Sequence, residues 1–372
     1  MNSAFCALPF YRATIRSNGG IGPCCYIRNY ANVKTSSIEE FWQSERLAAL
    51  RENMLSGQKC TDCESCYADE RNSGRSMRIE SLRDHSITDQ TDLRALIQGP
   101  NYLGREFPNH LEFHLGNLCN LKCLTCNPRD SSSFLIENNI LKISNHRQED
   151  YQMADETIEA VISTALEHRI KVLDLRGGES MLMPAVKRIL NELPDDHGIE
   201  CLRLQTNCTV LDDYWKRTFQ RFEQVEIMMS IDAYGPANEY IRYPSKWEEI
   251  EQNVDYFLSL SNIKLYVNCT ISNLNFLVLR PLIEWCRQKN IYFHYSLCTD
   301  PAYFQYNNLP AELFNQCLAN LADCPEVAKL ALESNNNKWN EFCQMIDLRD
   351  KHRRNSIFDI LPELKPYWSE QK

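Results

Sequence analysis

The sequence contains no long apolar run, and this excludes the simplest kind of membrane protein. No stretch of 18 apolar residues occurs in the 372-residue chain, so we expect no membrane-spanning helix. Residues 1–20 also lack the continuous apolar segment of a secretory signal peptide. We therefore expect a soluble, cytoplasmic protein that has no membrane partner.

An excess of basic residues is missing as well. The formal net charge is −10, whereas a broad nucleic-acid-binding surface normally carries an excess of Lys and Arg. The densest basic run, residues 351–355, is short and is typical of a solvated helix face. The composition thus argues weakly against nucleic acid as a partner and slightly favours a peptide or a small molecule.

Cysteine, in contrast, is abundant, with 17 residues. Disulfides do not persist in a reducing compartment, so clustered cysteines there indicate metal binding or redox chemistry. Six cysteines lie in the first 66 residues, and three more lie within residues 119–126. The remaining eight are scattered singly, and we interpret them as small buried hydrophobic residues: Cys201, Cys208, Cys269, Cys286, Cys298, Cys317, Cys324 and Cys343.

Between residues 108 and 300, short apolar runs alternate with amphipathic stretches. The apolar runs predict strands at 111–115, 171–175, 201–206, 225–231, 264–271 and 291–296. The amphipathic stretches predict helices at 154–169, 184–193, 247–260 and 279–289. Repeated strand–helix units favour parallel strands with right-handed crossovers, as in an open or closed α/β barrel or a doubly wound sheet. Ligands of such folds gather at the carboxyl ends of the strands.

The regions on either side of these repeats are different. Residues 1–80 form a cysteine-rich segment that predicts a hairpin around residues 17–20 and one helix over residues 36–57, with Ser37 as its cap and Gly57 as its end. Residues 81–107 are polar and are interpreted as a linker. Residues 301–372 predict a helical C-terminal extension.

The first strand leads directly into the sequence GNLCNLKCLTC, which places Cys119, Cys123 and Cys126 on the loop at its carboxyl end. Three thiolates can bind three irons of a [4Fe–4S] cluster and leave the fourth iron open to a substrate or cofactor. A zinc ion completed by a distant His would fit the spacing equally well.

In this context the C-x3-C-x2-C motif resembles the signature of the radical S-adenosylmethionine (SAM) enzymes. The resemblance implies a partial (β/α)6 barrel over residues 108–300, in which the open iron chelates the amino and carboxylate groups of SAM. It also implies that SAM is cleaved reductively to a 5′-deoxyadenosyl radical, which abstracts hydrogen from the substrate. An external electron donor of the flavodoxin or ferredoxin type is implied as well.

Five further segments resemble motifs of the same family, and they follow the predicted strands in order. They are RGGES (176–180), QTNC (205–208), SIDA (230–233), EYIRY (239–243) and VNCTISNLN (267–275). The resemblance implies that SAM is contacted by Gly177, Gly178, Glu179, Thr206, Asn207, Ser230, Asp232, Arg242 and Asn268. Among these, Glu179 would receive the amino group of SAM and Arg242 would face its carboxylate. Taken singly, each segment also fits a turn, a helix cap or an exposed ion pair.

Two residues depart from the family pattern. Thr125 occupies a position that is often aromatic, so a ring near the adenine is not expected. Cys208 replaces the glycine of a TNG segment, and a residue with a Cβ reaches positive φ less easily than glycine.

The N-terminal cysteines form a second constellation. Two distant cysteines and a C-x2-C pair can supply four thiolates to either zinc or an iron–sulfur cluster. The arrangement resembles the twitch domain, a half-size relative of the SPASM domain that holds one auxiliary [4Fe–4S] cluster. The resemblance extends to Glu70, to Ser76–Arg78 and to residues 362–364. The ligands it implies are Cys6, Cys24, Cys63 and Cys66, and Cys60 or Cys25 could replace one of them.

We therefore predict a radical SAM enzyme that modifies a peptide, a protein or a sugar-type small molecule and uses the auxiliary cluster for electron transfer. One alternative is a binding protein, stabilised by zinc or a cluster, that does not cleave SAM. Another is methyl transfer to RNA, with Cys298 or Cys208 as the methyl acceptor. His114, His294 and Tyr295 lie on predicted strands, where they are interpreted as core residues or substrate contacts. No catalytic acid or base is assigned.

Overall fold

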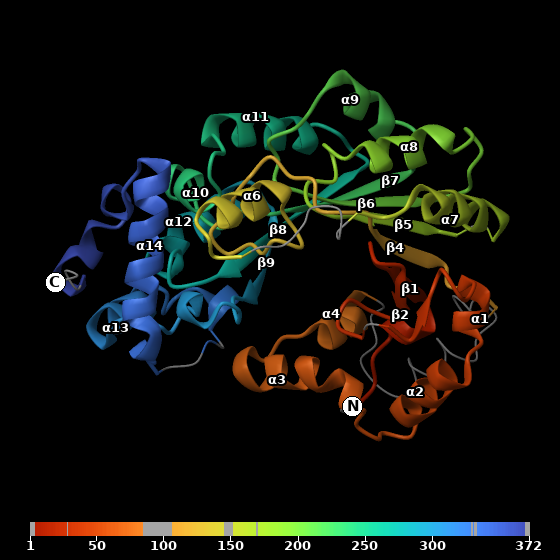
Figure 1. Cartoon of the computed structure of the whole chain (residues 1–372), viewed down its shortest axis with the longest axis horizontal. Helices are drawn as coiled ribbons and strands as arrows, with labels where there is room; N and C mark the ends of the chain where they lie inside the picture. Colours follow the sequence, from red (N-terminus) through yellow and green to blue (C-terminus); the bar gives the residue numbers. More distant parts are fainter. Residues whose placement is uncertain are drawn as a thin grey trace. The chain divides into compact units, whose positions relative to one another are not determined.

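The structure of the chain is a computed structural model that describes residues 4–27, 29–84, 106–144, 152–168, 170–328, 330 and 333–368. The chain divides into two compact units (Figure 1). The first comprises Met1–Gly116, Gln148–Leu204 and Arg217–Val225, and the second comprises Asn117–Arg147, Gln205–Lys216 and Glu226–Lys372. Most of the predicted linker, residues 81–107, lies outside the described residues.

The strands of the first unit follow the order β3-β2-β1-β4-β5-β6. The predicted hairpin is formed by β1 (Arg12–Ile15) and β2 (Gly20–Gly22), which pair antiparallel, and β3 (Ala31–Asn32) follows. Strand β1 also pairs in parallel with β4 (His110–His114), in a register that places Arg12 opposite His110. The cysteine-rich segment therefore extends the same sheet as the first strand of the β-α repeats.

Helices α1 (Ile38–Trp42) and α2 (Glu45–Leu55) replace the single helix that the sequence predicts over residues 36–57. The prediction of one continuous helix is wrong because Ser44 starts a new helix by accepting a hydrogen bond from the Leu47 amide at 3.3 Å. Ser37 caps α1 as predicted, within a capping box completed by Glu40. Helices α3 (Glu64–Ser73) and α4 (Met77–Asp84) complete the segment.

Strands β4, β5 (Val172–Arg176) and β6 (Cys201–Thr206) are parallel and largely buried on both faces. One face presents apolar side chains such as Leu111 and Phe113, whereas the opposite face of β4 carries His110 and Glu112. Helices α7 (Asp155–Glu167) and α8 (Pro184–Glu192) contact each other and bury Ile158, Val161, Ile162, Val186, Ile189 and Leu190. Sheets of this kind are normally covered on both faces.

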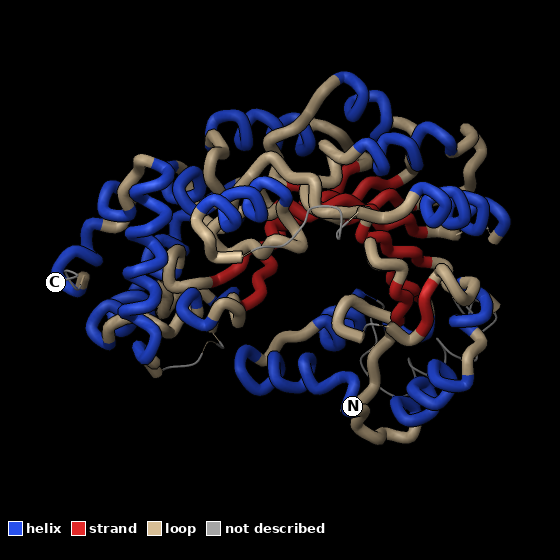
Figure 2. Tube along the Cα trace, in the orientation of Figure 1, coloured by secondary structure: helices blue, strands red, loops and turns tan. Residues whose placement is uncertain are grey.

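The second unit contains the remaining strands in the order β7-β8-β9. They are β7 (Gln224–Met229), β8 (Ile263–Ile271) and β9 (Tyr292–Leu297), of which β8 and β9 are parallel. Helix α11 (Trp247–Leu258) contacts β8, and α12 (Leu279–Gln288) contacts β9. The strands and helices alternate as Figure 2 shows. The other helices of the β-α region are α6 (Ser132–Ile140), α9 (Asp213–Phe219) and α10 (Pro236–Ile241).

The C-terminal extension is helical, with α13 (Ala311–Asn320) and α14 (Trp339–Arg353) followed by short 3-10 turns up to Tyr367. The predicted α/β class and the helical extension are thus confirmed, and all six predicted strands are present within two residues of their expected bounds. Within the described residues, no helix has the length and apolar character needed to cross a membrane.

Candidate functional site

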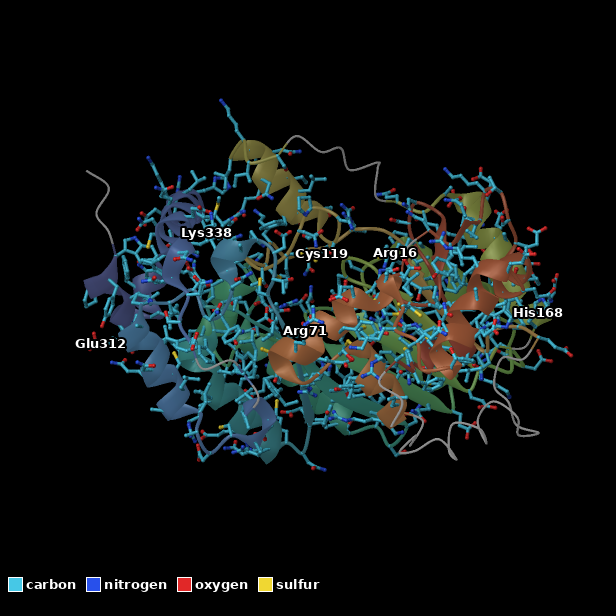
Figure 3. The ribbon with its side chains drawn as sticks, turned by 90° about the horizontal axis from the view of Figure 1, so that it is seen from below. Arg16, Arg71, Cys119, His168, Glu312 and Lys338 are labelled. Carbon is cyan, nitrogen blue, oxygen red and sulfur yellow. The ribbon has the colours of Figure 1, made fainter. Side chains whose placement is uncertain are left out.

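The three cysteines of the C-x3-C-x2-C motif lie together on the loop between β4 and α6. The first of them, Cys119, is labelled in Figure 3. Cys119 and Cys123 are buried, Leu121 lies between them, and the partly exposed Cys126 packs against this group. Burial raises the pKa of the Cys126 thiol well above its usual value, and the neighbouring Cys123 raises it further. Three crowded thiols of this kind are poor thiolates on their own and good ligands for a positively charged group.

Arg242 and Asp232 form an ion pair beside this loop. Their side chains are 2.7 Å apart, and Asp232 is fully buried. Burial opposes the charge on Arg242, but the Cys123 sulfur and then the Asp232 carboxylate raise its pKa. Among the described residues, the buried Arg242 Nε atom has no hydrogen-bond partner. Arg242 is thus held against the cysteine loop with one donor still to be satisfied, and it is not an exposed ion pair.

Asp232 is fixed from several directions. Its carboxylate accepts a hydrogen bond from the Thr270 amide on β8 at 2.8 Å, and its own amide donates to Asn238 Oδ1 at 3.0 Å. Asn275 Nδ2 donates to the Asp232 carbonyl oxygen at 2.8 Å. Asp232 therefore positions Arg242 from a rigid base and does not cap a helix.

Asn207 also reaches the cysteine loop. Its Nδ2 donates to Asn120 Oδ1 at 2.9 Å and lies 4.0 Å from Cys119 Sγ, while Asn120 Nδ2 donates to Thr209 at 2.8 Å. This contact ties the carboxyl end of β6 to the residue that follows the first cysteine. The sequence motif indicated Asn207 but gave no sign of Asn120 or Thr209.

Cys208 adopts φ +62° although it carries a Cβ. The left-handed conformation is held by two hydrogen bonds, one from the Cys208 amide to Thr206 Oγ1 at 3.1 Å and one from Asn253 Nδ2 to the Cys208 carbonyl oxygen at 2.8 Å. The backbone at Cys208 therefore reaches positive φ, which a glycine in a TNG segment would reach more easily.

The remaining predicted contacts of this unit occupy neighbouring positions. The Ser230 amide donates to the Thr206 carbonyl oxygen at 2.8 Å, and the Ser230 hydroxyl accepts from Gln205 at 3.2 Å. Asn268 on β8 faces His294 on β9, with Oδ1 3.0 Å from the ring Nδ1. Tyr295 is 3% exposed, as a core residue would be.

The glycine-rich segment RGGES belongs to the first unit. Gly177 has φ +155°, and a Cβ there would lie 2.8 Å from the Gly116 carbonyl oxygen and 2.6 Å from Met183 Sδ. Gly178 donates its amide to the same Gly116 oxygen at 3.0 Å. Glu179 is fully buried and accepts from the Met181 amide at 3.0 Å. Glycine at position 177 is therefore required by close backbone packing.

The four cysteines predicted as auxiliary ligands are brought together in the first unit. Cys6, Cys24, Cys63 and Cys66 are all buried. Burial raises the pKa of the Cys6 thiol to about 12, and Cys24 adds to this effect. Burial is also the largest cause of the raised pKa of Cys63, and the neighbouring Cys6 thiol is the second largest cause.

Of the two possible replacements, Cys60 lies near the same group, since it also raises the pKa of Cys63. Cys25 is also near members of this group, because Cys24 follows burial among the influences that raise its pKa to about 11, and Cys25 in turn raises the pKa of Cys66.

Glu70, Ser76 and Arg78 hold the four cysteines in place. Arg78 donates to Glu70 Oε2 at 2.6 Å and to the Phe5 carbonyl oxygen at 3.0 Å, next to Cys6. Ser76 donates to Glu70 Oε1 at 2.6 Å. Ser81, which the sequence did not single out, lies 3.6 Å from Cys6 Sγ. These side chains connect the helices after Cys66 to the segment that carries Cys6.

A buried charge network occupies strands β1, β4 and β5 of the first unit. Glu112 pairs with Arg12 and, at 3.1 Å, with Arg176. Burial favours the neutral acid, but Arg12 and then Arg176 hold the pKa of Glu112 well below its usual value. His114 bonds to the same carboxylate at 3.0 Å. His114 is thus satisfied by the fold, in line with its interpretation as a core residue.

Comparison with known proteins gives a match for the cysteine-rich segment. Residues 6–67 match the model of the SPASM family, described as an iron–sulfur cluster-binding domain. The chain is 25% identical over 187 residues to a probable GTP 3′,8-cyclase of Methanocaldococcus jannaschii, covering 50% of this chain and 56% of that protein. The chain thus contains one segment similar to an iron–sulfur cluster-binding domain and a longer region similar to a probable GTP 3′,8-cyclase.

Other similarities are more distant. Molybdenum cofactor biosynthesis protein 1 of Dictyostelium discoideum is 21% identical over 213 residues, which is 54% of this chain and 31% of that protein. The chain thus spans about a third to a little over half of the length of these two relatives. The solved structure of anSMEcpe with bound AdoMet is 19% identical, with a TM-score of 0.42 over 56% of this chain and 57% of that one.

Proposed function

We propose that this protein is a radical SAM enzyme, which cleaves SAM reductively at a [4Fe–4S] cluster held by Cys119, Cys123 and Cys126. The observation that carries the proposal is the three-thiol loop with the Arg242–Asp232 pair beside it. The loop supplies three ligands, so one iron of a four-iron cluster would stay open. When bound, this cluster would supply the electron that cleaves SAM to a 5′-deoxyadenosyl radical, which abstracts hydrogen from the substrate.

The residues around the loop have distinct tasks in this proposal. Arg242 offsets the negative charge of the thiolates and, through its unpartnered Nε atom, could donate to the carboxylate of SAM. Asp232 holds the guanidinium in place. Asn207 anchors Asn120, and Ser230 and Asn268 present polar side chains that could bind the nucleoside part of SAM.

The glycine-rich segment of the first unit is a separate part of the proposal. The backbone of Gly177 and Gly178 and the carboxylate of Glu179 would receive the amino group of SAM. Its support is the close packing at Gly177, which reserves that position for a residue without a Cβ.

We further propose that Cys6, Cys24, Cys63 and Cys66 hold an auxiliary [4Fe–4S] cluster. The proposal is supported by the burial of all four thiols and by the influence that neighbouring members of the set have on one another's pKa. The match of residues 6–67 to an iron–sulfur cluster-binding domain supports a cluster over zinc. With four thiolate ligands the centre would carry electrons.

The substrate that we propose is a peptide, a protein or a sugar-type small molecule, with electrons from a flavodoxin or ferredoxin. A net charge of −10 supports this class over nucleic acid. Because curated relatives are named GTP 3′,8-cyclase, GTP is the first small molecule to assay. Cys208 and Cys298 are 0% and 4% exposed, which does not favour either one as a methyl acceptor.

The test uses protein that has been reconstituted under anaerobic conditions. Iron and sulfide are counted, and 5′-deoxyadenosine is followed from SAM and dithionite. We expect about eight irons per chain. A variant with Cys119→Ala, Cys123→Ala and Cys126→Ala should keep about four and lose the product. If the protein contains zinc in place of iron, or if fully loaded protein forms no deoxyadenosine, the enzyme hypothesis fails and the binding-protein hypothesis is favoured.

A further inference from the structure

Helix α14 of the C-terminal extension carries two arginines that are buried against helix α6. Arg349 and Arg353 pair with the same carboxylate, Glu137, at 2.6 and 2.7 Å, and their side chains are 2% and 1% exposed. Arg349 also donates to Asn138 at 2.7 Å. Helix α6 follows the cysteine loop directly, so this buried cluster fixes the C-terminal extension to the element next to the loop.

Arg353 also binds the cysteine loop itself. Its Nη2 donates to the Lys122 carbonyl oxygen at 2.5 Å, and Lys122 is the residue before Cys123. The guanidinium lies 5.0 Å from the centre of the Tyr243 ring. The Tyr243 carbonyl oxygen in turn accepts from the Lys122 amide at 2.6 Å. Arg353 thus holds the backbone between the first two cysteines through one direct contact and one indirect contact.

Asp350, one turn earlier on α14, reaches the other side of the site. Its carboxylate accepts from the Tyr240 hydroxyl at 2.7 Å, and the Ile357 amide donates to it at 2.7 Å. Tyr240 is buried in α10, two residues before Arg242. One face of α14 therefore contacts both the cysteine loop and the helix that leads to Arg242.

Stability alone does not account for this arrangement. Buried ion pairs can often be replaced by apolar side chains without loss of stability, because removing charges from water is costly. What the charges add is direction, since a guanidinium can bond a carboxylate and a carbonyl oxygen in a fixed geometry. Such outer contacts set the orientation and electronic properties of metal ligands.

We propose that α14 is the positioning element of the SAM-cleaving site. Through Arg353 it fixes the cysteine loop, and through Asp350 and Tyr240 it fixes Arg242 relative to that loop. Arg353, Asp350 and Tyr240 are positioning residues, and none of them is expected to touch SAM. The expected effect on SAM cleavage rests on the proposed function, but the geometry of the cysteine loop can be measured without turnover.

The experiment compares three variants of the full-length, reconstituted protein. Arg353→Lys keeps the charge but cannot bond both Glu137 and the Lys122 carbonyl oxygen. Tyr240→Phe removes only the hydroxyl that Asp350 accepts. Tyr367→Phe is the matched control, because it removes a tyrosine–carboxylate bond to Glu312 in the same extension and does not affect the loop.

Three quantities are measured for each protein: iron content, the electron paramagnetic resonance spectrum and reduction potential of the loop cluster without SAM, and the KM and kcat of SAM cleavage. For Arg353→Lys we expect full iron content with an altered spectrum and potential. For Tyr240→Phe we expect an unaltered spectrum and a KM for SAM that is raised by about tenfold, with a smaller change in kcat.

The proposal is overturned if both variants match the Tyr367→Phe control in spectrum, potential and KM. If Arg353→Lys instead loses iron, Tyr240→Phe still decides, because its cluster ligands and charges are intact. If the wild-type protein forms no deoxyadenosine while Arg353→Lys still shifts the potential, the proposed function fails. The role of α14 in positioning the cysteine loop then still stands.

Discussion

At the scale of single residues, local packing distinguishes Gly177 from Cys208, although both have positive φ. Gly177 needs its missing Cβ, because the Gly116 carbonyl oxygen and Met183 would be too close to one. Cys208 also has positive φ, but its side chain is accommodated and two hydrogen bonds hold the conformation. Positive φ alone therefore does not require glycine, whereas positive φ with close backbone contact does.

Replacing Gly177 with alanine is expected to lower the free energy of unfolding by about 2 to 4 kcal/mol, from backbone strain and overpacking together. The matched control is Gly198→Ala. Gly198 has φ +69° with nothing within 4 Å of the added Cβ, so only strain of about 1 kcal/mol applies there. Urea unfolding of both variants measures the difference. Equal losses would show that the contact with Gly116 does not matter.

At the scale of elements, strand β4 is unusual because the polar face of a buried strand carries His110 and Glu112. His110 is 2% exposed, and its ring lies 3.5 Å from Asp174 on β5. Burial lowers the pKa of His110 to about 4, with Asp174 acting in the opposite direction. The strand is therefore built around a histidine that stays neutral at pH 7.

This predicts a loss of stability in mild acid. As the pH falls below about 6.5 the unfolded chain binds a proton at His110, whereas the folded protein binds it only near pH 4. The free energy of unfolding should decline across that window by about 3 kcal/mol in total. A His110→Gln variant should show a smaller decline in its thermal midpoint between pH 7 and about pH 5. An exposed control, His352→Gln, should behave as the wild type, and identical profiles for all three would contradict the prediction.

Much of the element structure could be predicted from the sequence because it depends on local patterns. The six strands of the β-α region follow runs of apolar residues, and Ser37 caps its helix as a local motif would indicate. The division between α1 and α2 was missed because a polar QSE segment fits a helix interior as well as a cap. The pairing of β1 with β4 joins residues far apart in the sequence, and no local pattern encodes it.

The candidate site shows the same limit. The spacing of Cys119, Cys123 and Cys126 could be read directly, because each lies within a few residues of the next. The contacts that orient the site could not, since Arg353 reaches Lys122 across more than half of the chain. Side chains that act on a site from distant elements leave no periodic signal.

At the scale of the whole molecule, the N-terminal segment combines four buried thiols with a local apolar core. Cys6, Cys24, Cys63 and Cys66 are buried, and so are the large side chains of Phe5, Phe41 and Trp42. A bound cluster would contribute directly to the folding of such a segment.

Removal of iron is therefore expected to act locally. After treatment with a chelator and an oxidant, limited proteolysis should cut within residues 6–67 well before the strands from β4 onward, and the thermal midpoint should fall. The variant that lacks the three loop cysteines but keeps its auxiliary cluster should resist cleavage in this segment. Uniform cleavage along the chain would argue that the thiols do not stabilise it.

The parallel pairing of β1 with β4 also affects the order in which the chain can fold during synthesis. Ribosomes release the chain from its first residue onward, so β1 emerges roughly a hundred residues before the strand that pairs with it. During that interval one edge of β1 has no partner strand, and Glu112, which pairs with Arg12 in the folded protein, has not yet been synthesised. The four cysteines that we propose as ligands of the auxiliary cluster are already synthesised by then. Under that proposal, the order of synthesis permits iron and sulfide to reach them before the sheet is complete.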